Sequence, residues 1–228
     1  VRHNRRFEPG FREVQEIVAA GTLGEVFEVK LRRTKYQRRD DWQTIKRYGG
    51  GQLLNWGPHI IDHALCLLGS EPVDIWGDLK RVAAVGDAED HVHIIMKGEN
   101  GRTVDLEITG GAAQDEPLYR IWGDAGALVS SDEALHLRYL NPEAELPERE
   151  AEEGNPPLNS FGTEEALDWR EDTIHLGPEM DDPTTRIVGH LYSTIREGKE
   201  FPISLEQAVK VMEVADTVRR GTEFELEV

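Results

Sequence analysis

The stretch GGGQLLNWGPHIIDHALCLLG, residues Gly49–Gly69, holds the most informative pattern in this chain. Its apolar residues recur at helical spacing, which predicts a buried helix. Pro58 limits where that helix can begin, because proline is tolerated only in the first turn. We therefore expect the helix to start near Asn55 and to carry His59 in its first or second turn.

Three polar residues, Asn55, His59 and Asp62, interrupt this apolar stretch at positions i, i+4 and i+7, so they share one helix face. Histidine suits proton transfer near neutral pH, and the start of a helix disfavours the protonated imidazole. The structural alternative makes Asn55 an N-cap and His59 a satisfied core histidine. For Asp62 we expect a structural role, as a hydrogen-bonded carboxylate that braces the helix and a nearby loop.

Composition narrows the class of protein. The chain has 228 residues and a formal net charge of −18, so its surface repels nucleic acid phosphates. No apolar run approaches the roughly 20 residues that cross a bilayer, and the first residues contain no signal sequence. A single cysteine, Cys66, excludes an internal disulfide and fits a buried thiol. We expect a cytoplasmic protein that binds neither nucleic acid nor membrane, and the abrupt start suggests a fragment of a longer protein.

Apolar and polar residues alternate after an initial helix that carries Phe11 and stops at Gly21. In the first strand this alternation groups Phe27 with Val29 and Leu31. Hairpin signals, such as Asn100 followed by glycine, imply antiparallel pairing. The predicted fold is α+β, with an open, largely antiparallel sheet and helices packed on one face. The expected strands are Glu25–Thr34, Pro72–Val82, His91–Lys97, Arg102–Thr109, Leu118–Trp122, Leu128–Ser130 and Ala134–Leu140.

The last third of the chain mixes a loop with two helices. Asn141–Pro157 is rich in glutamate and proline, which favours a solvated loop. Asp181–Glu197 and Ser204–Arg220 are predicted helices, and Ser204 with Gln207 has the spacing of a capping box. Thr222–Val228 is a candidate edge strand.

Two kinds of site are not expected. His91 and His93 alternate on one strand face, but no third ligand accompanies them, so we predict no metal site. The chain contains no Gly-x-Gly-x-x-Gly between a strand and a helix, and therefore no dinucleotide-binding fold of its own.

The pattern G-G-G-x-L-x-Asn-x-G-x-His-x-x-Asp resembles the second domain of the glucose–fructose oxidoreductase and inositol dehydrogenase (Gfo/Idh/MocA) family. The resemblance extends upstream through Asn4–Phe7 and Ala20–Gly24, and returns at Ile195–Gly198 and Pro202–Ser204. It implies that residues 1–228 form a C-terminal substrate-binding and oligomerisation domain without its N-terminal Rossmann domain. It also implies a dehydrogenase that acts on a CH–OH group of a sugar, cyclitol or derivative with NAD or NADP, bound mainly by the missing domain. Family members self-associate through the exposed sheet face, so we expect a homo-oligomer.

The resemblance also implies site residues. His59 occupies the position of the base that removes the alcohol proton, and Asn55 stands where the family usually has aspartate. The substrate-binding candidates are Asn4, Arg5, Tyr36, Trp42 and Gln114. Without the resemblance, the alternative interpretation is structural: Arg5 is a solvated or salt-bridged residue, and the loop that holds Trp42 is a surface loop. Because asparagine cannot take a proton, the alternative function is a non-catalytic sugar-binding, sensor or scaffold module.

Overall fold

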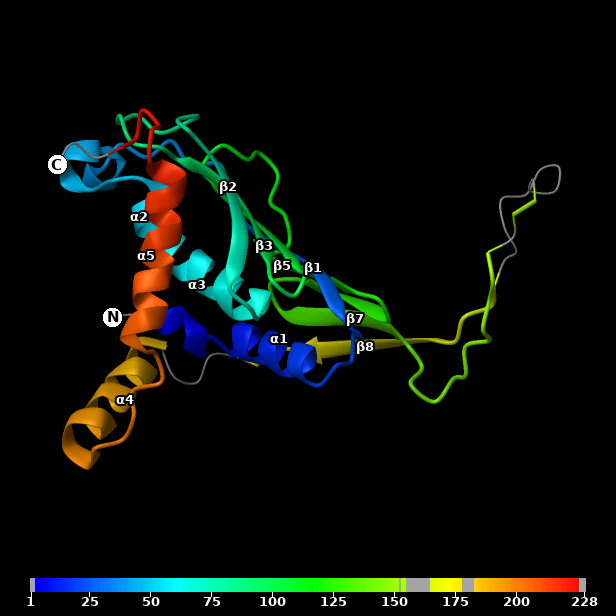
Figure 1. The fold of residues 1–228 in the computed structure, drawn as a ribbon. Helices are drawn as coiled ribbons and strands as arrows, with labels where there is room; N and C mark the ends of the chain where they lie inside the picture. Colours follow the sequence, from blue (N-terminus) through cyan, green and yellow to red (C-terminus); the bar gives the residue numbers. More distant parts are fainter. Residues whose placement is uncertain (1–2, 152, 155–164, 178–182, 226–228) are drawn as a thin grey trace.

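The computed structural model describes residues 3–151, 153–154, 165–177 and 183–225 (Figure 1). The strands in these ranges form one eight-stranded sheet in the order β2-β3-β4-β1-β5-β6-β7-β8. Only β1 and β4 pair in parallel, and the other neighbours are antiparallel. The open, largely antiparallel sheet is therefore confirmed. Its strands are β1 (Val26–Thr34), β2 (Pro72–Lys80), β3 (His91–Gly98), β4 (Thr103–Thr109), β5 (Tyr119–Gly123), β6 (Gly126–Ser130), β7 (Ala134–Leu140) and β8 (Trp169–His175).

The core lies between one face of this sheet and the helices. Alternate residues of β3, such as Val92, Ile94 and Met96, are fully buried on that face. Helices α1 (Pro9–Ala19), α3 (Gly57–Leu68) and α5 (Leu205–Arg219) cover it, while α4 (Pro183–Glu197) extends away (Figure 1). The other face carries the alternate residues, because successive side chains of a strand point to opposite sides, and it includes both polar residues such as His93 and exposed aromatic residues such as Trp76.

α5 packs closely on β2 at Gly77. A Cβ atom at this position would lie 2.1 Å from a side-chain carbon of Val218, so any larger residue would push the helix off the sheet. The predicted capping box of α5 is confirmed, because the Ser204 side chain accepts from the Gln207 amide and the Gln207 side chain accepts from the Ser204 amide.

The predicted burial of Phe27 is wrong. Its side chain is 50% exposed, whereas Val26 is 6% exposed and belongs to the core. The register of β1 against β5 shifts between Val26 and Glu28. Such a bulge reverses which residues face the core, and simple alternation cannot detect it.

The helix start predicted near Asn55 lies close to the observed start of α3 at Gly57, but the division of this stretch was not predicted. Two helices replace the single one: α2 (Gln52–Asn55) ends, Trp56 intervenes, and α3 begins at Gly57. The carbonyl of Trp56 accepts from the amides of His59 and Ile60 at 3.0 and 3.1 Å, which opens the second helix. Pro58 lies in the first turn of α3 and so does His59, as predicted.

α2 begins at a glycine for a steric reason. Gly51 has φ of 112°, and a Cβ atom there would lie 2.1 Å from a carboxylate oxygen of Glu89. That carboxylate is buried and accepts from the Leu53 amide at 3.0 Å, and burial raises the pKa of Glu89. The glycine therefore lets an acidic side chain reach the start of the helix.

Other differences lie toward the end of the chain. Strand β8 was not predicted, because its sequence, WREDTIH, is almost entirely exposed and has no alternation. In Thr222–Val228, residues 222–225 form a turn rather than a strand, and 226–228 lie outside the described residues. Within Asn141–Pro157, the described part has neither helix nor strand, and 152 and 155–157 lie outside it. Three short 3-10 helices complete the described chain: η1 (Asn4–Phe7), η2 (Trp42–Thr44) and η3 (Lys46–Tyr48).

Among the helices in the described ranges, none combines the length and the apolar character that a membrane crossing requires.

Candidate functional site

The first turn of α3 brings His59 beside Trp56. The two rings meet edge to face with their centres 6.0 Å apart. The Nδ1 atom of His59 is buried against the protein.

Two arginines contact the same indole of Trp56. The guanidinium carbon of Arg33 lies 3.1 Å from the ring centre, and that of Arg5 lies 4.2 Å from it. Arg33 comes from the end of β1 and Arg5 from η1, so three elements meet at Trp56. Partial burial and the positive charge of Arg5 lower the pKa of Arg33 to about 10, although nearby Glu8 opposes the shift. Arg33 stays charged at neutral pH, and Trp56 with its two arginines forms a cationic cluster.

Glu8 balances one of these charges. Its carboxylate forms an ion pair and a hydrogen bond with Arg5. Among the residues that the structure describes, no carboxylate forms an ion pair with Arg33. The cationic cluster therefore keeps one unbalanced positive charge.

Asp62 has the structural role that the sequence predicts. Its carboxylate is 1% exposed and accepts two hydrogen bonds of 2.6 Å from the Nε and Nη2 atoms of Arg6. Arg6 also donates to Gln207 at 2.8 Å. This bidentate pair ties η1 to α3 and reaches the start of α5, which fixes the segment that carries Arg5.

His63 supports the site from inside the core. Its ring stacks on Phe11 with centres 3.6 Å apart, and its Nδ1 atom lies 3.2 Å from the hydroxyl of Tyr119. Burial lowers the pKa of His63 to about 3, although the backbone carbonyl of Arg5 opposes the shift. Burial also raises the pKa of Tyr119, so the phenol keeps its proton and donates it. The neutral imidazole then accepts at Nδ1 and carries its own proton on Nε2.

Asn55 does not lie on the face of α3, because it ends α2. It is not the N-cap either, since Trp56 holds that position without a side-chain hydrogen bond. Its Nδ2 atom donates instead to the Oε1 atom of Gln43 at 3.1 Å. Asn55 thus anchors the loop before α2. The helix face predicted for it is wrong, and so is the N-cap role that the structural alternative gave it.

The other substrate-binding candidates are Asn4, Tyr36, Trp42 and Gln114. Asn4 begins η1 and is half-buried. Tyr36 and Trp42 are 57% and 60% exposed, and Gln114 is exposed in the loop after β4. An isolated bridge pairs Tyr36 with Gly111, which brings the loops of Tyr36 and Gln114 together. Substrate contact by these four residues stays a prediction.

Sequence reasoning missed Trp56 and Arg33. Arg33 has the same strand parity as the buried Val29 and Leu31, so a charged side chain directed toward the helices was a detectable signal. Trp56 gave no signal, because its role depends on a contact between segments far apart in the chain.

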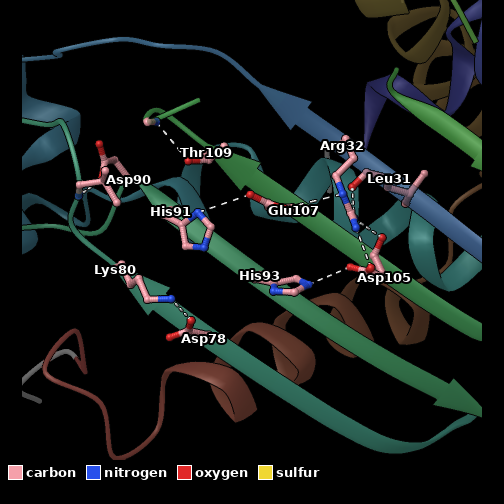
Figure 2. Close-up of polar contacts among 12 residues, drawn as sticks. Leu31, Arg32, Asp78, Lys80, Asp90, His91, His93, Asp105, Glu107 and Thr109 are labelled. Carbon is pink, nitrogen blue, oxygen red and sulfur yellow. Dashed lines mark hydrogen bonds and ion pairs between the residues drawn. The ribbon is translucent and has the colours of Figure 1, made fainter. Parts of the chain in front are cut away.

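A second polar cluster occupies the open face of the sheet (Figure 2). Arg32 pairs with Asp105 at 2.6 Å and with Glu107 at 3.7 Å. His93 Nε2 lies 2.8 Å from Asp105, and His91 Nδ1 lies 3.6 Å from Glu107. Burial opposes ionisation of Asp105, but the hydrogen bonds from Arg32 and His93 bring its pKa below the usual range. The charges of this cluster satisfy one another, and the described residues hold no group of three side chains suited to a metal.

The residues of this chain do not fit a nicotinamide dinucleotide. Such a cofactor needs a strand, a glycine-rich turn and a helix that presents its amino end to the pyrophosphate. The chain has no Gly-x-Gly-x-x-Gly, and its parallel pair, β1 and β4, is separated in sequence by α2, α3, β2 and β3. No cofactor contact is therefore assigned to residues of this chain.

Comparison with known proteins gives consistent matches. The family described as GFO/IDH/MocA C-terminal domain matches residues 11–129. The uncharacterized oxidoreductase YdgJ of Escherichia coli is 29% identical over 94% of this chain and 61% of its own length. The scyllo-inositol 2-dehydrogenase (NADP(+)) IolW of Bacillus subtilis is 20% identical over 97% of this chain and 62% of its own length.

Solved structures agree on the fold. An NAD-binding protein from Listeria innocua superimposes with a TM-score of 0.75 at 20% identity, over 98% of this chain and 64% of that chain. The chain thus spans about three fifths of the length of the relatives that it matches.

Proposed function

Because this chain belongs to the GFO/IDH/MocA C-terminal domain family, we propose that it is the substrate-binding part of an NAD(P)-dependent oxidoreductase. Residues 1–228 would form a single C-terminal domain, preceded in the whole protein by a Rossmann domain. The substrate is a sugar, a cyclitol or a derivative that reacts at a CH–OH group. One observation carries the proposal: His59 lies in the first turn of α3, beside the cationic cluster at Trp56.

His59 is the catalytic base in this proposal. Its Nδ1 is buried, so in this proposal the other ring nitrogen, Nε2, takes the proton from the substrate hydroxyl. The cofactor, NAD or NADP, would accept or supply the hydride, and residues outside this chain would hold it. Asn4, Arg5, Tyr36, Trp42 and Gln114 would bind the other hydroxyl groups.

Asn55 contributes position rather than proton transfer. An amide cannot take a proton, and its Nδ2 atom already donates to Gln43. In the proposal it holds the loop of Trp42 against the start of α3. This same observation favours a second candidate, a non-catalytic sugar-binding, sensor or scaffold module that kept the fold and lost the reaction.

The experiment uses the full-length protein. Sugars and polyols are screened for NAD(P)H formation with wild type, His59→Ala and a matched control, His175→Ala, which removes an exposed histidine of β8. We expect His59→Ala to lower kcat about 10²–10⁴-fold and His175→Ala to leave it unchanged. Equal turnover in His59→Ala and wild type would exclude His59 as the base. Clear ligand binding without turnover on any substrate would favour the non-catalytic module.

The open face of the sheet is the proposed surface for self-association. It presents Trp76, which is 51% exposed and meets the ring of His93, and Phe27, which is 50% exposed and lies beside Trp122. Exposed aromatic residues of this kind are typical of interface centres. We expect sedimentation velocity to show an oligomer that Trp76→Glu dissociates, and a monomeric wild type would contradict this.

The proposed compartment is the cytoplasm. The lone thiol of Cys66 is partly buried, and burial raises its pKa to about 11, so it is protonated and unreactive at neutral pH. The net charge of −18 argues against nucleic acid and anionic membrane surfaces as partners.

A further inference from the structure

The unbalanced charge of Arg33 is unusual for this protein. The chain carries a net charge of −18, yet two arginines converge on the indole of Trp56. The aromatic face attracts both guanidinium groups, but it does not neutralise them. Glu8 pairs with Arg5, and within the described chain Arg33 has no carboxylate partner. The amino end of α3, which starts directly after Trp56, adds further positive potential.

A cavity of about 670 Å³ adjoins Arg33. This volume suits a small molecule. Phe11 and Tyr119 supply apolar surface, and Ser130 and Ser131 supply hydroxyl groups. Glu8, Asp115, Glu116 and Asp132 also line it, and of these carboxylates Glu8 acts on the charge of Arg33. The cavity therefore places the cation of Arg33 among carboxylates, and these carboxylates can accept hydrogen bonds from hydroxyl groups.

We infer that Arg33, together with Arg5 and Trp56, binds an anionic group of a polyhydroxylated ligand, namely the carboxylate of a sugar acid or the phosphate of a sugar phosphate. A guanidinium offers several fixed donors that match either group. Arg33 lines the cavity, and its guanidinium and the ring of His59 contact the same indole. The inference rests on the proposed function only in placing the reacting hydroxyl of that ligand at His59.

The test measures binding to the full-length protein by calorimetry at fixed, low ionic strength. The probes are D-glucuronate, its neutral counterpart D-glucose, and inorganic phosphate. The variants are Arg33→Gln, which removes the charge, and Arg33→Lys, which keeps the charge but not the planar group. Arg12→Gln is the matched control, because it removes an exposed arginine of α1. Circular dichroism establishes that each variant is folded.

Wild type should bind D-glucuronate about tenfold or more tightly than D-glucose, and phosphate should compete with D-glucuronate. Arg33→Gln should abolish both the preference and the competition, Arg33→Lys should keep part of them, and Arg12→Gln should match wild type. Equal anion binding by Arg33→Gln and wild type would overturn the inference. So would the absence of anion binding by wild type.

Two further comparisons are needed. The first tells whether the bound anion belongs to a substrate or to a dinucleotide, and the second tells whether the anion site or the proposed dehydrogenase activity is wrong. NAD and NADP affinities are measured for wild type and Arg33→Gln, and a loss confined to the dinucleotides would overturn the assignment to a substrate. Binding needs no turnover. An inactive protein that shows Arg33-dependent anion binding would therefore reject the dehydrogenase while supporting the anion site.

Discussion

Arg5 and Arg6 are neighbours in η1, yet their side chains have opposite surroundings. Arg6 is directed into the protein, where its guanidinium makes two hydrogen bonds to Asp62 and one to Gln207. Arg5 contacts Trp56, where Arg33 adds a second positive charge and Glu8 balances only one of the two. One arginine has a buried counter-ion within the protein, and the other belongs to a cluster of two guanidinium groups with one ion-paired carboxylate.

The difference separates structural from functional roles. A buried ion pair holds the fold in place, and removing one partner costs stability. A charge that the fold leaves unbalanced costs free energy in the absence of a ligand, which is typical of a binding site. On this criterion the polar cluster on the open sheet face, where Arg32 has two acidic partners, is structural as well.

The largest expected effect comes from breaking the buried pair. Asp62→Asn leaves the guanidinium of Arg6 without its counter-ion, so we expect a loss of about 3–5 kcal/mol in the free energy of unfolding. Urea denaturation of the full-length protein measures it, with Asp74→Asn, an exposed position on β2, as the control. If Asp62→Asn behaved like the control, Arg6 and Arg5 would not differ in the way proposed.

The next effect concerns pH and the buried His63. Its pKa is about 3 in the folded protein and near 6.5 when unfolded, so the unfolded chain binds the extra proton between these values. The contribution of neutral His63 to the free energy of unfolding is fully present above pH 6.5. It falls by about 1.4 kcal/mol for each unit by which the pH decreases below that value. His63→Phe keeps an aromatic ring against Phe11 and removes the titration.

The measurement is urea denaturation between pH 4.5 and 7.5. His63→Phe should flatten the pH dependence of the free energy of unfolding by one proton, while His175→Ala, at an exposed position, should not. An unchanged slope in His63→Phe would mean that His63 is accessible to protons in the folded state, contrary to its burial.

The sequence predicts the fold well wherever local patterns decide it. Hairpin turns and alternation gave β3, β4 and β7 nearly to the residue, and the Ser204 capping box gave the start of α5. The prediction fails where the structure of a segment depends on how strands pair with one another. The bulge that exposes Phe27 and the exposed strand β8 have no signature in a single segment.

The candidate site divides in the same way. Asp62 could be predicted as structural, because a carboxylate inside an apolar helix must find a partner. The role of Asn55 could not be predicted, since its position depends on the separation of α2 from α3 at Trp56. The sequence could not predict the cationic cluster, because Arg5, Arg33 and Trp56 come from three segments that meet only in the folded protein.

The smallest expected effect completes the comparison of the two arginine environments. Arg33→Gln removes a contact with the face of Trp56, which is worth about 0.5–1 kcal/mol near a surface, but it also removes the repulsion between Arg33 and Arg5. We therefore expect the free energy of unfolding to change by less than about 1 kcal/mol, while Arg6→Gln, measured beside it by urea denaturation, costs several times more. A loss in Arg33→Gln as large as that in Arg6→Gln would show that Arg33 is also held for the fold, because a residue whose charge serves a ligand contributes little to stability when the ligand is absent.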